Sequence, residues 1–538
     1  MPSKRRLAAI VGTLLLASGV FTAAVLGGGT APSAASNGGR TAPRAADPSA
    51  QLQGVAAAAA QPRPNIVMVL TDDLSSNLVK YMPHVRAMKR EGMTFANYTV
   101  SNSLCCPSRS SILTGDYPHN TGVFANQGPD GGFGEFQANG DEQHTFALAL
   151  QGSGYRTAMM GKYLNGYSPT TLSGYADPKQ VGWPGTPAIG GNYVAPGWTT
   201  WAVQGNGYSE FNYDLNFDHR ILYYGNAPGD FGVHTIDRLG QGFIANSVDT
   251  GNPFMLELAT FAPHAPYVSA YRDRDRFRTV KAPRTPAWDT TPRHAPRWLA
   301  RRPPLTDRQI TKIDHQFRAR VRAVQSVDRA IGHLRDELRL DGQLSNTVFI
   351  FTSDNGLHLG EYRLTAGKLS AFDTDVRVPL IVTGPGIPAG RVSHAVVQNI
   401  DLAQTFEQLA GLTPDPGADG ESIVSLLHGH RPAGWPTLAL IEHHGVDFTA
   451  YQTDPDRQPV TGGRVPTYNA LRSAQFTYVH YQNGQREYYD RRTDPYEIDN
   501  LIHHLSPQRI HTLDQWLAAL TSCSGSAQCT AARSPAQR

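Results

Sequence analysis

Cysteine is scarce in this sequence, and neither sign of charge predominates. The 538 residues include four cysteines, and 48 basic against 45 acidic side chains leave a formal net charge of +3. No basic repeat or arginine-rich run is present, so nucleic acid is not an expected partner. Hydrophobic residues make up 40% of the chain and charged residues 17%, which is typical of a soluble globular protein and excludes a fibre. The length is sufficient for one large α/β domain and a smaller one.

The amino terminus has the layout of a secretory signal. Lys4-Arg5-Arg6 is followed by an apolar stretch from Leu7 to about Val25 and then by small residues. A retained signal anchor is the alternative, because the stretch is nearly long enough to span a bilayer. Glycine, serine and threonine residues interrupt it and favour cleavage. We therefore predict a signal peptide over residues 1–30, export (secreted, periplasmic or cell-surface), and no stable membrane insertion after cleavage.

Composition divides the rest of the chain into three parts. Residues 31–64 are mostly Ala, Gly, Ser and Pro, which cannot bury enough apolar surface to fold, so a flexible linker is expected there. The main folded domain is predicted over residues 65–435 and a smaller carboxy-terminal subdomain over residues 436–538. In an exported protein the close spacing of Cys523 and Cys529 makes a small disulfide loop plausible.

Paired polar side chains follow two strands that the sequence predicts. Ile66–Leu70 is a continuous apolar run typical of a buried parallel strand, and Asp72-Asp73 comes directly after it. Thr347–Thr352 is a second such run, followed by Asp354-Asn355. Either pair alone could form a helix cap or a turn. Two such strand ends together favour a shared metal site, because adjacent buried carboxylates need a neutralising cation. Oxygen ligands suit Ca²⁺ or Mg²⁺ better than Zn²⁺.

The most informative segment runs from Cys105 to Pro118. Pro107 near a helix start and Gly115 past its end predict a short helix from about Pro107 to Thr114. The free N–H groups of its first turn would favour an anion beside Cys105. A disulfide between Cys105 and its neighbour Cys106 would be badly strained. An isolated cysteine is usually a buried structural residue, but the residues around this one indicate another role.

This segment resembles, without a mismatch, the signature Cys-x-Pro-Ser-Arg-x-x-x-Leu-Thr-Gly-x-x-Pro of the type I sulfatases. The resemblance implies an alkaline-phosphatase-like α/β fold, with a large, mixed, mostly parallel sheet between helices. A small antiparallel sheet and a helix near Leu505–Leu520 would form the carboxy-terminal subdomain. It also implies that a maturation enzyme oxidises Cys105 to formylglycine, whose hydrated aldehyde attacks the sulfur of a sulfate ester, with Cys106 as a packed neighbour. The implied Ca²⁺ ligands, with Mg²⁺ the less expected ion, are Asp72, Asp73, Cys105, Asp354 and Asn355.

Three further segments extend the resemblance. They are Gly154–Tyr163, which contains the Gly-Lys pair; Phe261–Tyr267, which contains Pro-His-x-Pro; and Gly356–Glu361 with Lys368 beyond it. By the resemblance, Lys162 and Lys368 clamp the sulfate oxygens, and Arg109 holds the formylglycine hydroxyl. His264 is the candidate general acid for the leaving oxygen.

The chain departs from the arylsulfatase pattern at one point. Arylsulfatases carry Gly-Lys-x-His, and that histidine helps to eliminate sulfate, whereas this chain reads Gly-Lys-Tyr-Leu-Asn over Gly161–Asn165. The base for elimination is therefore open, with His119, His144 and His358 as unranked candidates. The altered form resembles N-acetylglucosamine-6-sulfatases and heparan endosulfatases, which implies a 6-sulfated N-acetylglucosamine-like sugar as substrate and possible use of aryl sulfates.

Two other functions share many of these features. A phosphonate monoester or phosphodiester hydrolase could use the same scaffold and nucleophile, and a non-catalytic protein could bind sulfated glycans. A segment rich in Gly, Pro, Trp and Tyr, from Tyr175 to Tyr213, has two equally weighted interpretations: a sugar-facing loop or a well-packed irregular one. Its tryptophans are Trp183, Trp198 and Trp201.

Overall fold

The computed structural model describes residues 63–170, 192–445 and 462–535. The predicted signal peptide, residues 1–30, and all of the predicted linker except Arg63 and Pro64 lie outside these ranges. The first strand begins at Asn65, where the sequence predicts that the folded domain starts. Among the described residues, no helix has both the length and the apolar character needed to cross a bilayer.

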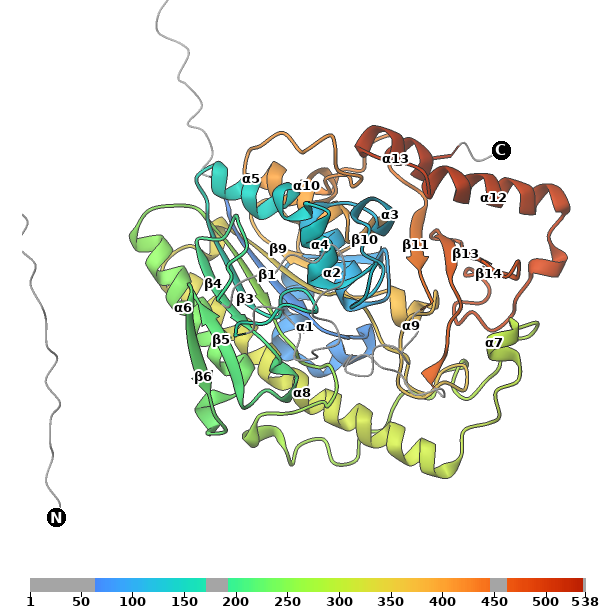
Figure 1. Cartoon of the computed structure of the whole chain (residues 1–538), viewed down its shortest axis with the longest axis horizontal. Coiled ribbons are helices and arrows are strands. Elements are labelled where there is room, and N and C mark those ends of the chain that lie inside the picture. Colours follow the sequence, from blue (N-terminus) through green and yellow to red (C-terminus); the bar gives the residue numbers. More distant parts are fainter. Residues whose placement is uncertain (1–62, 171–191, 446–461, 536–538) are drawn as a thin grey trace, which may run out of the picture. The chain divides into compact units, whose positions relative to one another are not determined.

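A mixed sheet of ten strands forms the centre of the protein (Figure 1). Its strands are β1 Asn65–Thr71, β2 Met93–Thr99, β3 Arg156–Gly161, β4 Thr200–Gln204, β5 Tyr213–Phe217, β6 Arg220–Tyr224, β7 Phe254–Ala259, β8 Thr347–Ser353, β9 Ile381–Thr383 and β10 Arg391–Gln398. They lie in the order β10-β2-β9-β8-β1-β7-β3-β4-β5-β6. The five from β8 to β4 pair in parallel, as do β10 and β2, whereas β5 and β9 are antiparallel to their neighbours.

Strand β1 shows why the sequences of the central strands are continuously apolar. Successive side chains of a strand point to opposite faces. Ile66 and Met68 join one buried cluster with residues of α2, α4, α5 and α10, whereas Val67 and Val69 join another with residues of α1, α6 and α8. Helices cover both faces, so each side chain is removed from water, which stabilises the fold by about 1.5–3 kcal/mol per residue. These helices are α1 Pro83–Glu91, α2 Cys105–Thr114, α4 Gly132–Ala138, α5 Phe146–Gly152, α6 Gly232–Asp249, α8 Asp307–Leu340 and α10 Asp401–Leu409.

The long helix α8 carries the apolar spacing that the sequence displays before the second acidic turn. It starts with a capping box, in which the Thr306 side chain accepts from the backbone N–H of Gln309 and the Gln309 side chain accepts from that of Thr306. Val324, Ile331 and Leu338 recur on one face and are buried. Short helices elsewhere are α3 Pro118–Thr121, α7 Arg297–Ala300, α9 Asp373–Val376 and α11 Val424–Leu427.

The carboxy-terminal part forms a second, four-stranded sheet. Its antiparallel strands are β11 Ala439–His443, β12 Tyr468–Arg472, β13 Phe476–Tyr481 and β14 Arg486–Asp490. Helix α12, Pro507–Leu520, has Ser506 as its side-chain cap, and α13, Ser526–Arg533, follows it. Cys523 and Cys529 form the disulfide that their spacing suggested. The two sheets and their helices confirm the predicted fold class.

The tryptophan-rich segment is packed where the structure describes it. Trp183 lies outside the described residues, but Trp198 and Trp201 are buried in the main core, and Trp201 is 0% exposed. The indole N–H of Trp201 donates to the Tyr167 hydroxyl at 3.0 Å. The segment is also not wholly irregular, since β4 lies within it. For these two tryptophans the packed interpretation holds and the sugar-facing one is wrong.

Candidate active site

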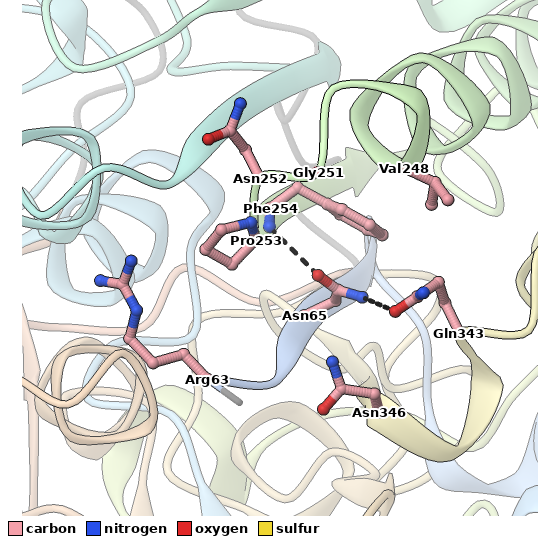
Figure 2. Close-up of a pocket in the computed structure, with 9 residues that line it drawn as sticks. All are labelled: Arg63, Asn65, Val248, Gly251, Asn252, Pro253, Phe254, Gln343 and Asn346. Atoms are coloured by element: carbon pink, nitrogen blue, oxygen red, sulfur yellow. Dashed lines mark hydrogen bonds between the residues drawn. The ribbon is translucent and has the colours of Figure 1, made fainter. Parts of the chain in front are cut away.

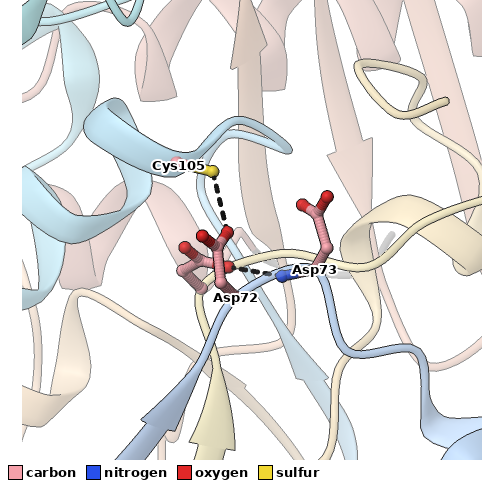
Figure 3. Close-up of side chains that lie close together, drawn as sticks. Asp72, Asp73 and Cys105 are labelled. Atoms are coloured by element: carbon pink, nitrogen blue, oxygen red, sulfur yellow. Dashed lines mark hydrogen bonds between the residues drawn. The ribbon is translucent and has the colours of Figure 1, made fainter. Parts of the chain in front are cut away.

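Strand pairing brings the two acidic turns together. β1 and β8 are adjacent and parallel, with Thr71 opposite Ser353, so the residues that follow both strands emerge at one edge of the sheet. One ligand atom each from Asp72, Asp73, Cys105 and Asp354 lies within 4.8 Å of the others, and all four residues are buried. In Figure 3 the sulfur of Cys105 points toward the carboxylate of Asp72, and their Sγ–Oδ1 distance is 3.1 Å.

Cys105 is the first residue of α2, which begins two residues earlier than predicted. The first N–H groups of a helix have no partner within it, so Pro107 is accommodated inside the first turn. The helix ends at Gly115, whose φ of 85° is left-handed and whose missing Cβ leaves room for the Gln404 amide. Every residue of α2 is buried. Burial also raises the pKa of the Cys106 thiol to about 12, so Cys106 is a packed neighbour without thiolate character at neutral pH.

Three cationic side chains face the three carboxylates. Lys162 Nζ lies 2.6 Å from Asp72 Oδ2, and Lys368 Nζ lies 2.7 Å from Asp73 Oδ1. Arg109 donates from Nε to Asp354 Oδ2 at 2.8 Å and from a terminal nitrogen to the backbone oxygen of Lys162 at 2.9 Å. Burial would raise the pKa of Asp354, but the charges of Arg109, Lys162 and Lys368 outweigh it, and that pKa is lowered. Removing one partner from such a buried set would leave an uncompensated charge.

Two buried polar atoms in this cluster have no hydrogen-bond partner among the described residues. One is the NH2 nitrogen of Arg109 and the other is the Oδ1 oxygen of Asn355. The Asn355 amide is oriented by its Nδ2 atom, which donates to Asp73 Oδ1 at 2.6 Å and to the Gly356 carbonyl at 2.9 Å. Its free oxygen lies beside carboxylates, and such a donor set fits a hard divalent cation. Asn355 thus joins the cluster that the sequence predicts.

His264 lies at the margin of the same cluster. Its Nε2 atom is 3.6 Å from Asp73 Oδ2, and its Nδ1 atom is 2.7 Å from the Ala265 carbonyl oxygen. Because a carbonyl can only accept, Nδ1 carries a proton and the ring orientation is fixed. The Tyr208 ring packs on His264 with 4.6 Å between centroids and also lies 5.1 Å from Lys162 Nζ.

The structure does not support any of the three candidate histidines as the base for sulfate elimination. His119 faces the Glu442 carboxylate and the Cys523 carbonyl, and His358 faces the Asp375 carboxylate and the Gly462 carbonyl. Burial opposes protonation of both rings, but these acceptors prevail and raise both pKa values. A ring that donates from both nitrogens cannot accept a further proton. His144 is exposed at the end of a short 3₁₀ helix.

Other residues at the site are not among those that the sequence assigns a role, although Ser108 is a specified position of the signature. Ser108 donates to the Asp354 carbonyl at 2.5 Å and is itself held by Asn399, which follows β10. Arg320 of α8 donates to the Asp73 carbonyl. Glu257 is buried in β7, where burial raises its pKa and the positive charge of Arg109 partly lowers it. A buried strand residue, a serine inside a motif and an arginine in a long helix look ordinary until the fold brings them together.

A separate cavity of about 200 Å³ lies near the opposite edge of the sheet, where β1 and β7 begin. In Figure 2, Asn65 accepts from the Phe254 backbone N–H and donates to Gln343. The residues that line it contribute amides and one arginine but no carboxylate, thiol or histidine. This cavity therefore lacks the groups needed for ester hydrolysis, and the acidic cluster is the candidate active site.

The fold and the grouped carboxylates, cations and cysteine first define a class, the alkaline-phosphatase-like enzymes. The Sulfatase family profile matches residues 64–412, and that of N-sulphoglucosamine sulphohydrolase, C-terminal, matches residues 360–522. The chain is 32% identical to N-acetylglucosamine-6-sulfatase of Homo sapiens over 496 residues, which cover 87% of this chain and 86% of that protein. The chain belongs to the sulfatase family, and it is an enzyme that hydrolyses sulfate esters.

Solved structures share the fold at lower identity. One, determined in complex with its substrate D-glucosamine-2-N,6-O-disulfate, has a TM-score of 0.66 and 22% identity, covering 85% of this chain and 97% of that one. The phosphonate monoester hydrolase from Silicibacter pomeroyi has a TM-score of 0.61 and 18% identity, covering 84% and 93%. The fold alone therefore does not distinguish a sulfate ester from a phosphonate ester as substrate.

Proposed function

We propose that this sulfatase uses a formylglycine made from Cys105 together with a Ca²⁺ ion, and that it removes sulfate from a 6-sulfated N-acetylglucosamine-like sugar. The observation that carries the mechanism is the convergence of Cys105, three carboxylates and three cations in one buried cluster. The name of the human relative supports the substrate class. Aryl sulfates would also react, because a good leaving group lowers the demand on the site.

The metal and the modified residue would each contribute one element of the chemistry. Asp72, Asp73, Asp354 and Asn355 would hold Ca²⁺ beside position 105, and the ion would polarise the sulfate oxygens. A hydrated formylglycine would supply two hydroxyl groups, one that attacks sulfur and one whose deprotonation allows sulfate to leave. An unmodified cysteine or a serine has no second hydroxyl.

The remaining residues would position the reacting groups and neutralise the charge of the substrate. Arg109 is anchored by Asp354 and has one terminal nitrogen without a described partner, so it can hold a hydroxyl at position 105. Lys162 and Lys368 would release Asp72 and Asp73 to a bound dication and then contact the terminal oxygens of the sulfate. His264, with its orientation fixed through Nδ1–H, would act in its imidazolium form and donate the Nε2 proton to the leaving oxygen. The base for elimination stays open.

The test compares sulfate release from N-acetylglucosamine 6-sulfate with turnover of nitrophenyl sulfate and of a phosphate diester. The sulfated sugar should be the best substrate, and a clear preference for the diester would overturn the proposal. Peptide mass spectrometry should find the peptide containing Cys105 lighter by roughly 18 Da, the mass lost when a thiol becomes an aldehyde. A fully active enzyme with an unmodified thiol would refute the formylglycine mechanism.

Export and the domain boundaries belong to the same proposal. We infer that residues 1–30 direct export and are removed, that residues 31–64 link the released end to the catalytic domain, and that residues 65–435 and 436–538 are the catalytic and carboxy-terminal parts. The disulfide between Cys523 and Cys529 supports an oxidising location. Amino-terminal sequencing of protein secreted by an expression host checks this, and recovery of an intact amino terminus would contradict it.

A further inference from the structure

A pocket of about 370 Å³ lies on the carboxy-terminal subdomain and is unrelated to the acidic cluster by residue or element. Its volume falls in the range of small-ligand sites, about 300–1,000 Å³. The residues that line it are Thr437, Leu438, Ser473, Gln475, Phe476, Arg509, Trp516 and Pro535. Two aromatic rings, one cation, an amide and two hydroxyl groups are present, and no lining residue is acidic.

Arg509 is held in this pocket by aromatic rings. Its guanidinium carbon lies 5.0 Å from the centre of the Trp516 ring and 5.6 Å from that of Phe476. Arg509 and Trp516 are two turns apart on α12, so they share one face of the helix. Phe476 begins β13 and is itself stacked on Tyr488 at 5.6 Å and 19°. The planar cation therefore has a rigid, preorganised support.

No hydrogen bond or ion pair joins the Arg509 guanidinium to any part of the chain that the structure describes, and its backbone N–H donates to the Ser506 hydroxyl. Four other arginines of the subdomain differ, because Arg472, Arg486, Arg491 and Arg492 each pair with a carboxylate. Trp516 is half-buried and its indole N–H likewise has no partner within the described ranges. The pocket thus offers the Arg509 guanidinium and the Trp516 indole N–H as hydrogen-bond donors that no acceptor of the described residues occupies.

We propose that this pocket binds an anionic sugar unit of a sulfated glycan, at residues separate from those of the candidate active site. An aromatic face packs against a pyranose ring, and a guanidinium binds a sulfate or carboxylate group through paired hydrogen bonds. The inference rests on the proposed glycan substrate. It adds a second attachment point, which raises the affinity for a chain of several sugars but not for a single one.

The experiment uses the full chain carrying Cys105→Ala, so that binding is measured without turnover. Titration calorimetry with a heparin tetrasaccharide should give a Kd that Arg509→Gln weakens about tenfold, as expected for loss of a charge-assisted hydrogen bond. Trp516→Ala should weaken it too, and Arg509→Lys should restore part of the affinity. Hyaluronan tetrasaccharide, which has carboxylates only, tests whether sulfate is required. Arg308→Gln, at an exposed arginine of α8, is the matched control and should leave Kd unchanged.

Equal affinity in the parent, Arg509→Gln and Trp516→Ala variants would overturn the proposal, as would an equal loss in Arg308→Gln. In chains with Cys105 intact, Arg509→Gln should raise KM for the tetrasaccharide and leave kcat/KM for nitrophenyl sulfate unchanged. Thermal melting verifies that each variant is folded. If the parent releases no sulfate from any sugar while binding still depends on Arg509, the substrate proposal fails and the pocket stands.

Discussion

The Nζ atom of Lys368 lies 3.0 Å from the sulfur of Cys105. The same atom is 2.7 Å from Asp73 Oδ1, so one ammonium group joins the predicted nucleophile position to a predicted metal ligand. Lys162 plays a parallel part at Asp72. The two lysines balance the carboxylates in this arrangement, and both would be available to substrate oxygens once a dication binds. In the proposed mechanism, the same two lysines would therefore serve both the charge balance of the site and the binding of the substrate.

Replacing Cys105 by Ala should abolish sulfate release and change stability little. The side chain is small, so its loss costs about 1 kcal/mol of packing, of the order measured when one buried methyl group is removed. Turnover of nitrophenyl sulfate and the melting temperature check both parts. Cys106→Ala is the matched control: it removes an equally buried thiol one residue away and should keep its turnover. Near-normal activity in Cys105→Ala would refute the assigned nucleophile.

Two substitutions separate metal binding from charge balance. Asn355→Ala removes the unpartnered Oδ1 oxygen without exposing a charge, so bound Ca²⁺ should fall while the melting temperature shifts by a few degrees. Asp354→Ala should lose the metal and activity as well, and should also destabilise the fold by about 3–5 kcal/mol, because Arg109 is left buried and unpaired. Elemental analysis of the purified proteins measures the metal, and full occupancy in either variant would argue against the shared site.

Glu257 should make stability depend on pH. Burial raises its pKa from 4.5 to about 7, and Arg109 offsets only part of that rise. Between these values the folded protein binds more protons than the unfolded chain, so stability falls as pH rises through the window. The loss is complete above the folded pKa and amounts to about 3 kcal/mol.

Glu257→Gln removes this titration. The difference in free energy of unfolding, variant minus parent, should therefore be about 3 kcal/mol larger at pH 8 than at pH 4.5. Denaturant unfolding at both pH values measures the difference. Asp275→Asn, whose side chain is 85% exposed, should show no such change. A parallel pH profile in parent and Glu257→Gln would mean that the carboxyl is neutralised in another way.

The disulfide should contribute modestly to stability. It closes a loop with a sequence separation of 6 residues, for which chain entropy predicts about 2 kcal/mol. The Cys523 carbonyl also accepts from His119 and Asn120, so the loop is attached to the segment after α2. The double variant Cys523→Ala/Cys529→Ala should melt a few degrees lower with unchanged turnover of nitrophenyl sulfate. A large loss of activity would instead indicate that the loop supports the site directly.

The strand ends and the helix of the nucleophile were predictable because their signals are local. Asp72 and Asp354 follow continuous apolar runs, and Gly115 marks the end of α2. The start of α2 was misplaced by two residues, since proline tolerates any position in the first turn. Glu257 and Ser108 were missed, because their roles depend on contacts between distant elements. Trp201 could equally have faced a sugar or the core, as composition records residue type and not direction.

Burial of α2 sets a time limit on the proposed maturation. Cys105 is 0% exposed, so the proposed oxidation of its thiol would have to take place before the fold is complete. The acidic turns that close the site are 281 residues apart, and contacts of such long range form slowly. A delay of this kind would leave the segment accessible until the later strands have been made. In the proposed mechanism, a molecule that folds with its thiol unchanged would remain inactive, so the fraction of active enzyme would depend on the relative rates of modification and folding.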